Sequence, residues 1–130
     1  MTSAPRLFSI LRQSPYLIAS IHTALDDSQL MRFKGDLVQR IGHERARGVV
    51  VDVAALDVLD SYASRTLRDI GEMARLRGAA TVIVGIRPEV AFAMVQLGMD
   101  TGSVVTALDL EEGIAVLDRA LTGPTTVRRG

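Results

Sequence analysis

A run of β-branched residues, Gly48–Val53, constrains the fold of this chain more than any other stretch. The run is too short for a helix and lacks the polar alternation of a half-buried strand, so it predicts a buried central strand. Beyond the turn that follows this run, apolar side chains recur at steps of three and four residues at Ala63, Leu67, Ile70 and Ala74. That spacing predicts a helix with one buried face. A buried strand followed by such a helix is typical of an α/β sheet.

Strands and helices are expected to alternate along the rest of the chain. In order, we expect strands at 7–11 and 16–21, a helix from Asp26 to Gly42, the strand at 48–53, a helix from 60 to 77, a strand at 81–84, a helix from Pro88 to Gly98, a strand at 104–106, and a helix from Asp109. An initial hairpin followed by alternation predicts a mostly parallel mixed sheet of about five strands with four helices. We assign residues 1–122 to this single domain and expect residues 123–130 to form a disordered tail.

The ends and faces of these helices are predicted from local signals. Asp26 with Gln29 three residues later fits a capping box, and Gly42 is the expected C-cap of the same helix. Asp109 with Glu112 repeats the first of these patterns. In the helix that starts at Pro88, four apolar side chains are expected to be buried: Val90, Ala91, Met94 and Val95.

Composition argues against several kinds of site and partner. The chain has no cysteine, which excludes disulfides and thiolate metal sites. Fifteen basic residues balance fifteen acidic ones and only 4% of residues are aromatic, so composition favours neither nucleic acid nor an anionic membrane. No apolar run approaches the ~18 residues that cross a bilayer, and residues 1–6 do not resemble a signal peptide. We therefore expect a cytoplasmic protein without a cofactor.

The sequence also gives little support for catalysis. His22 and His43 are the two histidines, and neither lies in a recognisable catalytic or metal-binding motif. The glycines match neither a phosphate-binding loop nor a dinucleotide fingerprint. Asp52 lies on the central strand, but the acidic cluster that a phosphorylated aspartate requires is missing and the sole lysine, Lys34, lies in the first expected helix. We therefore predict a structural role for Asp52 near the edge of the sheet.

The turn at residues 56–64 joins the central strand to the next helix. Asp60 and Ser61 stand where that helix begins, a position that favours short side chains whose oxygen accepts a backbone N–H. From this spacing alone, a simple helix cap and a functional site remain about equally open. Ser64 and Thr66 follow inside the helix, where a kinase would reach them less easily.

This turn resembles the phosphorylation loop of STAS domains, the anti-sigma factor antagonist family. The resemblance extends in order along most of the chain, over Leu25–Asp27, Gly48–Asp52, Val58–Tyr62, Gly85–Ala91, Leu97–Gly98 and Thr106–Gly113. Generic antagonists usually carry Asp-Ser-Ser/Thr-Gly, whereas Tyr62 and Ala63 follow Ser61 here. That departure makes the chain more similar to the stressosome branch of the family.

The resemblance implies a STAS fold and a non-enzymatic regulatory scaffold of the bacterial general stress response. It implies that Ser61 is the phosphoacceptor for a switch serine kinase, which the protein sequesters and releases on phosphorylation, and that a protein phosphatase resets the site. It also implies homo-oligomers and hetero-oligomers with a STAS-domain paralogue. The expected partner-binding residues are Asp57, Val58, Asp60 and Tyr62. Two alternatives remain: a simple antagonist that binds an anti-sigma kinase directly, and a small α/β enzyme whose pocket forms in an oligomer.

Overall fold

One mixed sheet with helices on both faces forms the domain. The computed structural model describes residues 6–99, 101–102 and 104–129, with side chains as far as residue 121. Its elements are β1 (Phe8–Gln13), β2 (Tyr16–Ile21), α1 (Asp27–Glu44), β3 (Gly48–Asp52), α2 (Ser61–Leu76), β4 (Ala80–Val84), α3 (Pro88–Gln96), β5 (Val105–Ala107) and α4 (Leu110–Arg129). Within these residues the strand order is β1-β2-β3-β4-β5, with β1 antiparallel to β2 and the other pairs parallel. The predicted fold class, with five strands and four helices, is confirmed.

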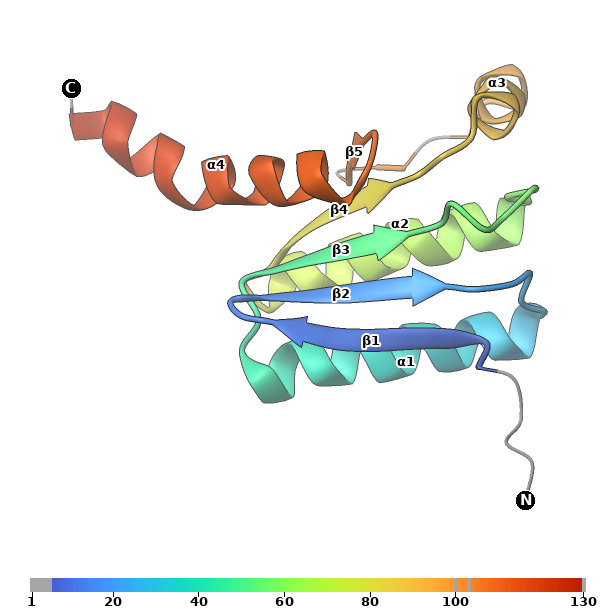
Figure 1. Cartoon of the computed structure of the whole chain (residues 1–130), viewed down its shortest axis with the longest axis horizontal. Coiled ribbons are helices and arrows are strands. Elements are labelled where there is room, and N and C mark those ends of the chain that lie inside the picture. The colour runs from blue at the N-terminus through green and yellow to red at the C-terminus, as the bar shows by residue number, and fades with distance from the viewer. Residues whose placement is uncertain (1–5, 100, 103, 130) are drawn as a thin grey trace.

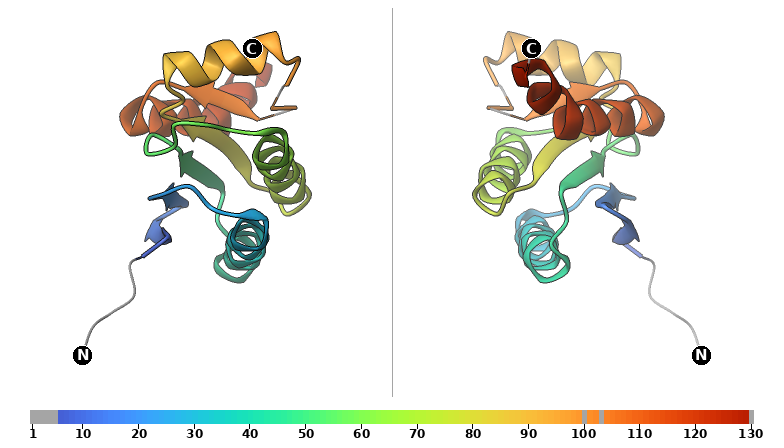
Figure 2. Two further views of the ribbon diagram at one scale, coloured as in Figure 1. Left: turned by 90° about the vertical axis from the view of Figure 1, so that its right-hand side faces the viewer. Right: turned by 90° about the vertical axis from the view of Figure 1, so that its left-hand side faces the viewer.

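The valines of β3 explain the uninterrupted apolar run in the sequence. Val49 and Val51 face the core cluster that contains the buried side chains of α1 and α2, whereas Val50 faces a second cluster with Leu117 of α4. In Figure 1 and Figure 2, α1 and α2 lie side by side on one face of the sheet and α4 lies on the other. Because both faces of β3 are covered, neither face of the strand requires polar residues.

The N-terminus of α1 has the predicted capping box. The Gln29 N–H donates to Asp26 Oδ1 at 2.8 Å, and the Asp26 N–H donates to Gln29 Oε1 at 2.9 Å. The bond from Gln29, together with one from the Ser28 hydroxyl, lowers the pKa of Asp26. A similar pattern opens α4, where the Glu112 N–H donates to Asp109 Oδ1 at 2.9 Å.

The C-terminus of α1 differs from the prediction. Arg45, not Gly42, is the C-cap, and it adopts the left-handed conformation at φ 54°. Gly42 lies inside the helix, where an added Cβ would overlap the Arg77 guanidinium from the end of α2. The prediction that Gly42 ends the helix is therefore wrong. This glycine instead makes room for a side chain of the neighbouring helix.

α3 buries a narrower stripe than predicted. Val90 and Met94 are buried as predicted. Ala91 and Val95 are exposed, so the prediction of burial is wrong for these two side chains. In Figure 1, α3 lies beyond the end of β4, not across a face of the sheet. Only one side of a helix in that position contacts the core. Phe92 is 66% exposed, so α3 carries apolar side chains on its exposed side as well as on its buried side.

α4 continues past residue 122, where we placed the end of the domain. The helix runs as far as Arg129 and so includes most of the segment that we expected to be a tail. The disorder of residues 123–130 in solution stays a prediction. Among the described helices, none combines the length and apolar content needed to span a bilayer.

A hydrogen bond between Tyr16 and Asp118 links β2 to α4. The Tyr16 hydroxyl donates to Asp118 Oδ1 at 2.5 Å, and the Tyr16 side chain is buried. Burial, followed by the hydrogen bond to Asp118, raises the pKa of Tyr16 to about 12 from its ordinary value of 10.0. The folded state therefore holds this proton more tightly than the unfolded state does.

The Tyr16 pKa predicts a loss of stability at alkaline pH. Below pH 10 the proton is bound in both states, and the contribution of Tyr16 to the free energy of unfolding is fully present. Between pH 10 and about 12 the unfolded chain releases the proton first, so the free energy of unfolding falls. We expect Tyr16→Phe to remove this part of the decline when urea unfolding is measured from pH 9 to 12. An unchanged alkaline slope in the variant would contradict the assignment.

Candidate functional site

Ser61 occupies the first position of α2, after the turn that follows β3. Asp52 Oδ1 accepts the Ala54 N–H at 2.9 Å and so helps to begin the turn, which fits its predicted structural role at the end of β3. Asp60 is the N-cap of α2, and its Oδ1 accepts the Ala63 N–H at 2.8 Å. Ser61 is exposed. Because Asp60 supplies the cap, the Ser61 side chain is not needed to start the helix.

The four residues expected to bind a partner differ in exposure. Asp57, Val58 and Asp60 are exposed, and Val58 shows 72% of its surface to solvent. Tyr62 is half-buried against the core, with the Arg65 guanidinium 6.0 Å from its ring centre. The turn therefore presents Asp57, Val58 and Asp60 beside Ser61, with Tyr62 packed below. Their role in partner binding stays a prediction.

The hydroxyls of Ser64 and Thr66 lie on the buried face of α2. Both residues are only 3% exposed, and the Thr66 hydroxyl donates to the Tyr62 carbonyl at 2.9 Å. A kinase would have to displace α2 from the core to reach either side chain. Of the serine and threonine hydroxyls at this end of the helix, that of Ser61 is thus the accessible one.

Arg87 ties the β4–α3 loop to the turn that carries Ser61. Its Nη1 donates to Asp57 Oδ1 at 2.6 Å and its Nε donates to the Ala54 carbonyl at 3.1 Å. Gly85 allows the two loops to approach, because its φ is +83° and an added Cβ would lie 3.0 Å from the Ala54 backbone. Sequence reasoning missed Arg87 as a site residue. The available signal was an arginine at an N-cap position, where side-chain acceptors are preferred.

We expect Arg87→Ala to loosen the turn without unfolding the domain. The Arg87–Asp57 pair is exposed, so its loss should change the free energy of unfolding by at most about 1 kcal/mol. Amide hydrogen exchange in residues 54–60 should become faster, because two of the bonds that order this turn are lost. Arg75→Ala is the matched control, since it breaks an ion pair with Glu72 elsewhere on the surface. Unchanged exchange at 54–60 in Arg87→Ala would contradict the role of Arg87.

A groove of about 570 Å³ opens between this turn and α3. Its described lining residues are Asp57, Val58, Leu59, Asp60, Ser61, Glu89, Val90, Ala93, Leu97 and Met99. The walls are mostly apolar, and the polar groups are three carboxylates and the Ser61 hydroxyl. The three carboxylates are the possible bases among these lining residues, but no hydrogen bond joins any of them to the Ser61 hydroxyl, and no imidazole, thiol or amine is present among the lining residues. The groove therefore suits an apolar ligand or side chain better than hydrolytic chemistry.

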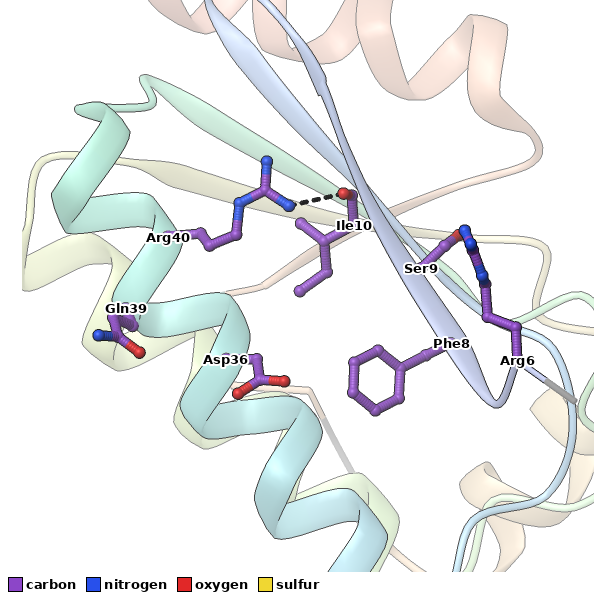
Figure 3. A pocket seen from close by; sticks show the side chains of 7 residues that line it. All are labelled: Arg6, Phe8, Ser9, Ile10, Asp36, Gln39 and Arg40. Atoms are coloured by element: carbon purple, nitrogen blue, oxygen red, sulfur yellow. Dashed lines mark hydrogen bonds between the residues drawn. The ribbon is translucent and has the colours of Figure 1, made fainter. Parts of the chain in front are cut away.

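A second hollow, of about 390 Å³, lies between β1 and α1 (Figure 3). It is lined by Arg6, Phe8, Ser9, Ile10, Asp36, Gln39 and Arg40. Arg40 Nη1 donates to the Ile10 carbonyl at 2.7 Å, as the dashed line in Figure 3 marks. Ser9 Oγ lies 3.1 Å from His22 Nε2, but both groups are exposed and no orienting carboxylate for His22 is seen among the described side chains. This pair thus lacks the third member of a hydrolytic triad.

Among residues 6–99, 101–102 and 104–129, no group of three metal-ligating side chains occurs.

Comparison with known families identifies the fold. Residues 9–112 match the model of the STAS domain. The chain belongs to the STAS domain family. This STAS domain is 32% identical to a serine-to-glutamate variant of RsbS from Moorella thermoacetica, with a TM-score of 0.77 over 88% of this chain and 97% of that chain. It is 30% identical, with a TM-score of 0.70, to a chain of the stressosome, described as a signal integration and transduction hub; the match covers 88% of this chain and 99% of that chain.

Curated relatives match over a smaller part of their length. The RsbT co-antagonist protein RsbRA of Bacillus subtilis (strain 168) is 31% identical over 90 residues, which are 69% of this chain and 33% of RsbRA. The co-antagonists RsbRD and RsbRB of the same organism are also similar, and this chain spans less than half the length of each of the three. The resemblance to the stressosome branch is therefore confirmed at the level of family and fold.

Proposed function

We propose that this STAS domain is a regulatory scaffold of the stressosome type that binds a switch serine kinase and is phosphorylated by it on Ser61, which releases the kinase. The observation that carries the proposal is an exposed serine at the first position of α2, whose cap is supplied independently by Asp60. Similarity to RsbS and to a stressosome chain supports the same assignment.

A phosphate on Ser61 has opposing local effects on the domain. It adds about 1.5 to 2 negative charges. The N-terminus of α2 favours that charge by about 0.3–1 kcal/mol, whereas Asp57 and Asp60 repel it through solvent that screens the interaction. Neither effect is large enough to unfold the domain. The principal effect falls on a bound partner, because a dianion buried in an interface without a cation costs several kcal/mol.

The proposed assembly follows from the relatives. We propose homo-oligomers and hetero-oligomers with an RsbR-like STAS paralogue, a protein phosphatase that resets Ser61, and a cytoplasmic location where the kinase finds ATP. The domain acts without a cofactor and without catalytic activity of its own, as the mostly apolar groove beside Ser61 supports.

Light scattering of this chain mixed with the paralogue should show a particle much larger than either protein alone. Tight binding of an anti-sigma kinase without any paralogue assembly would favour the simple antagonist.

Phosphosite mapping tests the central step. The purified chain is incubated with magnesium, ATP and the switch serine kinase of the same organism, and its phosphorylated residues are mapped by mass spectrometry. Wild type should carry phosphate at Ser61 only, and none when the kinase is omitted. Ser61→Ala should carry none, whereas Ser28→Ala should behave as wild type. Ser28 is a matched control because it is an exposed serine that follows aspartates at the start of α1. Phosphate at another residue, or no phosphate in wild type, would overturn the proposal.

A further inference from the structure

The groove beside Ser61 exposes apolar surface that the fold itself does not require. Val58 and Leu97 stand at its sides and are each 72% exposed. Leu59 and Val90 also line the groove and are buried, whereas Ala93, the next lining residue of α3 after Val90, is exposed. Other apolar side chains, such as Leu76 and Leu108, are also exposed, but a concave apolar surface of this kind is typical of an interaction site.

Carboxylates line the same groove. Asp57, Asp60 and Glu89 all contribute to it, and Asp57 is paired with Arg87. Asp60 adds negative charge at the N-cap of α2, and Glu89 adds it in the first turn of α3. An apolar centre with an acidic margin is complementary to an apolar side chain flanked by arginine or lysine.

We propose that this groove is the docking site for an apolar, basic-flanked segment of the switch kinase, and that a phosphate on Ser61 closes it. The inference rests on the proposed function, which supplies the kinase as the occupant. Ser61 itself lines the groove, so a kinase that reaches this hydroxyl covers the groove as well. A phosphate at the same position brings charge and volume into the apolar centre. Docking and phosphorylation therefore exclude each other on a single surface.

Filling the groove tests its role in docking. Ala93→Phe places a large side chain in the groove, and Ala91→Phe places the same side chain on α3 outside it. Both alanines are exposed, so both variants should fold, which thermal unfolding verifies. Calorimetric titration with the purified switch kinase should show at least a tenfold loss of affinity for Ala93→Phe and less than a twofold change for Ala91→Phe. Leu97→Ser, which removes one wall, is the second groove variant and should also lose affinity.

Charge reversal tests the acidic margin. Glu89→Arg reverses a carboxylate in the first turn of α3, and Glu111→Arg makes the same change in the first turn of α4 outside the groove. The first variant should weaken kinase binding at low salt by at least fivefold and the second by less than twofold. Equal effects of the two variants would overturn the proposed charge complementarity.

The outcomes separate this inference from the proposed function. If wild type binds the kinase and is phosphorylated on Ser61, but Ala93→Phe and Leu97→Ser bind equally well, the groove is not the docking site although the proposed function stands. If Ala93→Phe loses self-association in light scattering but keeps kinase affinity, the occupant is a second copy of this chain and the inference fails. If wild type neither binds the kinase nor is phosphorylated, the proposed function fails first.

Discussion

Ser61→Asp is expected to lower the affinity of this STAS domain for the kinase at least tenfold while leaving the domain folded. A tenfold change needs only about 1.4 kcal/mol of unfavourable interaction at the interface. The aspartate would place a carboxylate in an apolar groove that already contains Asp57, Asp60 and Glu89. The mimicry is partial, because a carboxylate has less charge and fewer oxygens than a phosphate. Binding measured by calorimetry at fixed salt gives the comparison.

Ser61→Ala is the matched control for that substitution. It should keep wild-type affinity for the kinase and hold the kinase after ATP is added, because no phosphate can form at residue 61. Its stability should stay close to that of wild type, since the Ala63 N–H is capped by Asp60 and not by Ser61. Asp60→Ala, by contrast, should cost about 0.5–2 kcal/mol of unfolding free energy through loss of that cap. Equal kinase affinity for wild type, Ser61→Ala and Ser61→Asp would contradict the switch.

Phe33→Ala is expected to cause the largest loss of stability that a single truncation produces in this chain. Phe33 is 0% exposed, and its ring meets that of Phe8 edge to face at 5.1 Å between centroids. Removing a fully buried phenylalanine costs about 3–5 kcal/mol, from lost transfer free energy and the cavity that remains. A typical domain has only about 5–15 kcal/mol of stability, so the variant should lose a large share of its free energy of unfolding.

Phe92→Ala provides the same change of side chain on the surface. Phe92 of α3 is 66% exposed, so its truncation should alter the unfolding free energy by about 0.5 kcal/mol or less. Urea unfolding of the two variants and wild type, analysed with a common m-value, measures the difference. Similar losses in both variants would show that Phe33 does not occupy the core position described above.

The order of elements and most helix starts were predictable because local signals encode them. The β3 valines, the capping box of Asp26 and Gln29, and the aspartate at residue 60 each act within a few residues. Hydrophobic periodicity likewise identified the buried faces of α1 and α2. These features depend on the chain's own neighbours, so a sequence without an alignment is enough to find them.

The features that sequence missed depend on residues far apart in the chain. Gly42 was misassigned because its role is to accommodate Arg77, which arrives from another helix. Ala91 and Val95 were misassigned because the position of α3 at the end of the sheet decides which side is covered. Arg87 binds residues about thirty positions earlier, and the groove exists only because α3 lies beside the Ser61 turn. No local pattern specifies such contacts.

The bond from Arg40 to the Ile10 carbonyl has a consequence for how copies of this protein join. β1 is an edge strand, and edge strands offer unpaired backbone groups to any extended segment that meets them. Here a guanidinium from the same molecule already takes one of those carbonyls (Figure 3). A second strand would have to displace Arg40 before it could pair there. In the proposed assembly, contacts at the β1 edge should therefore be made by side chains and not by pairing with a further strand.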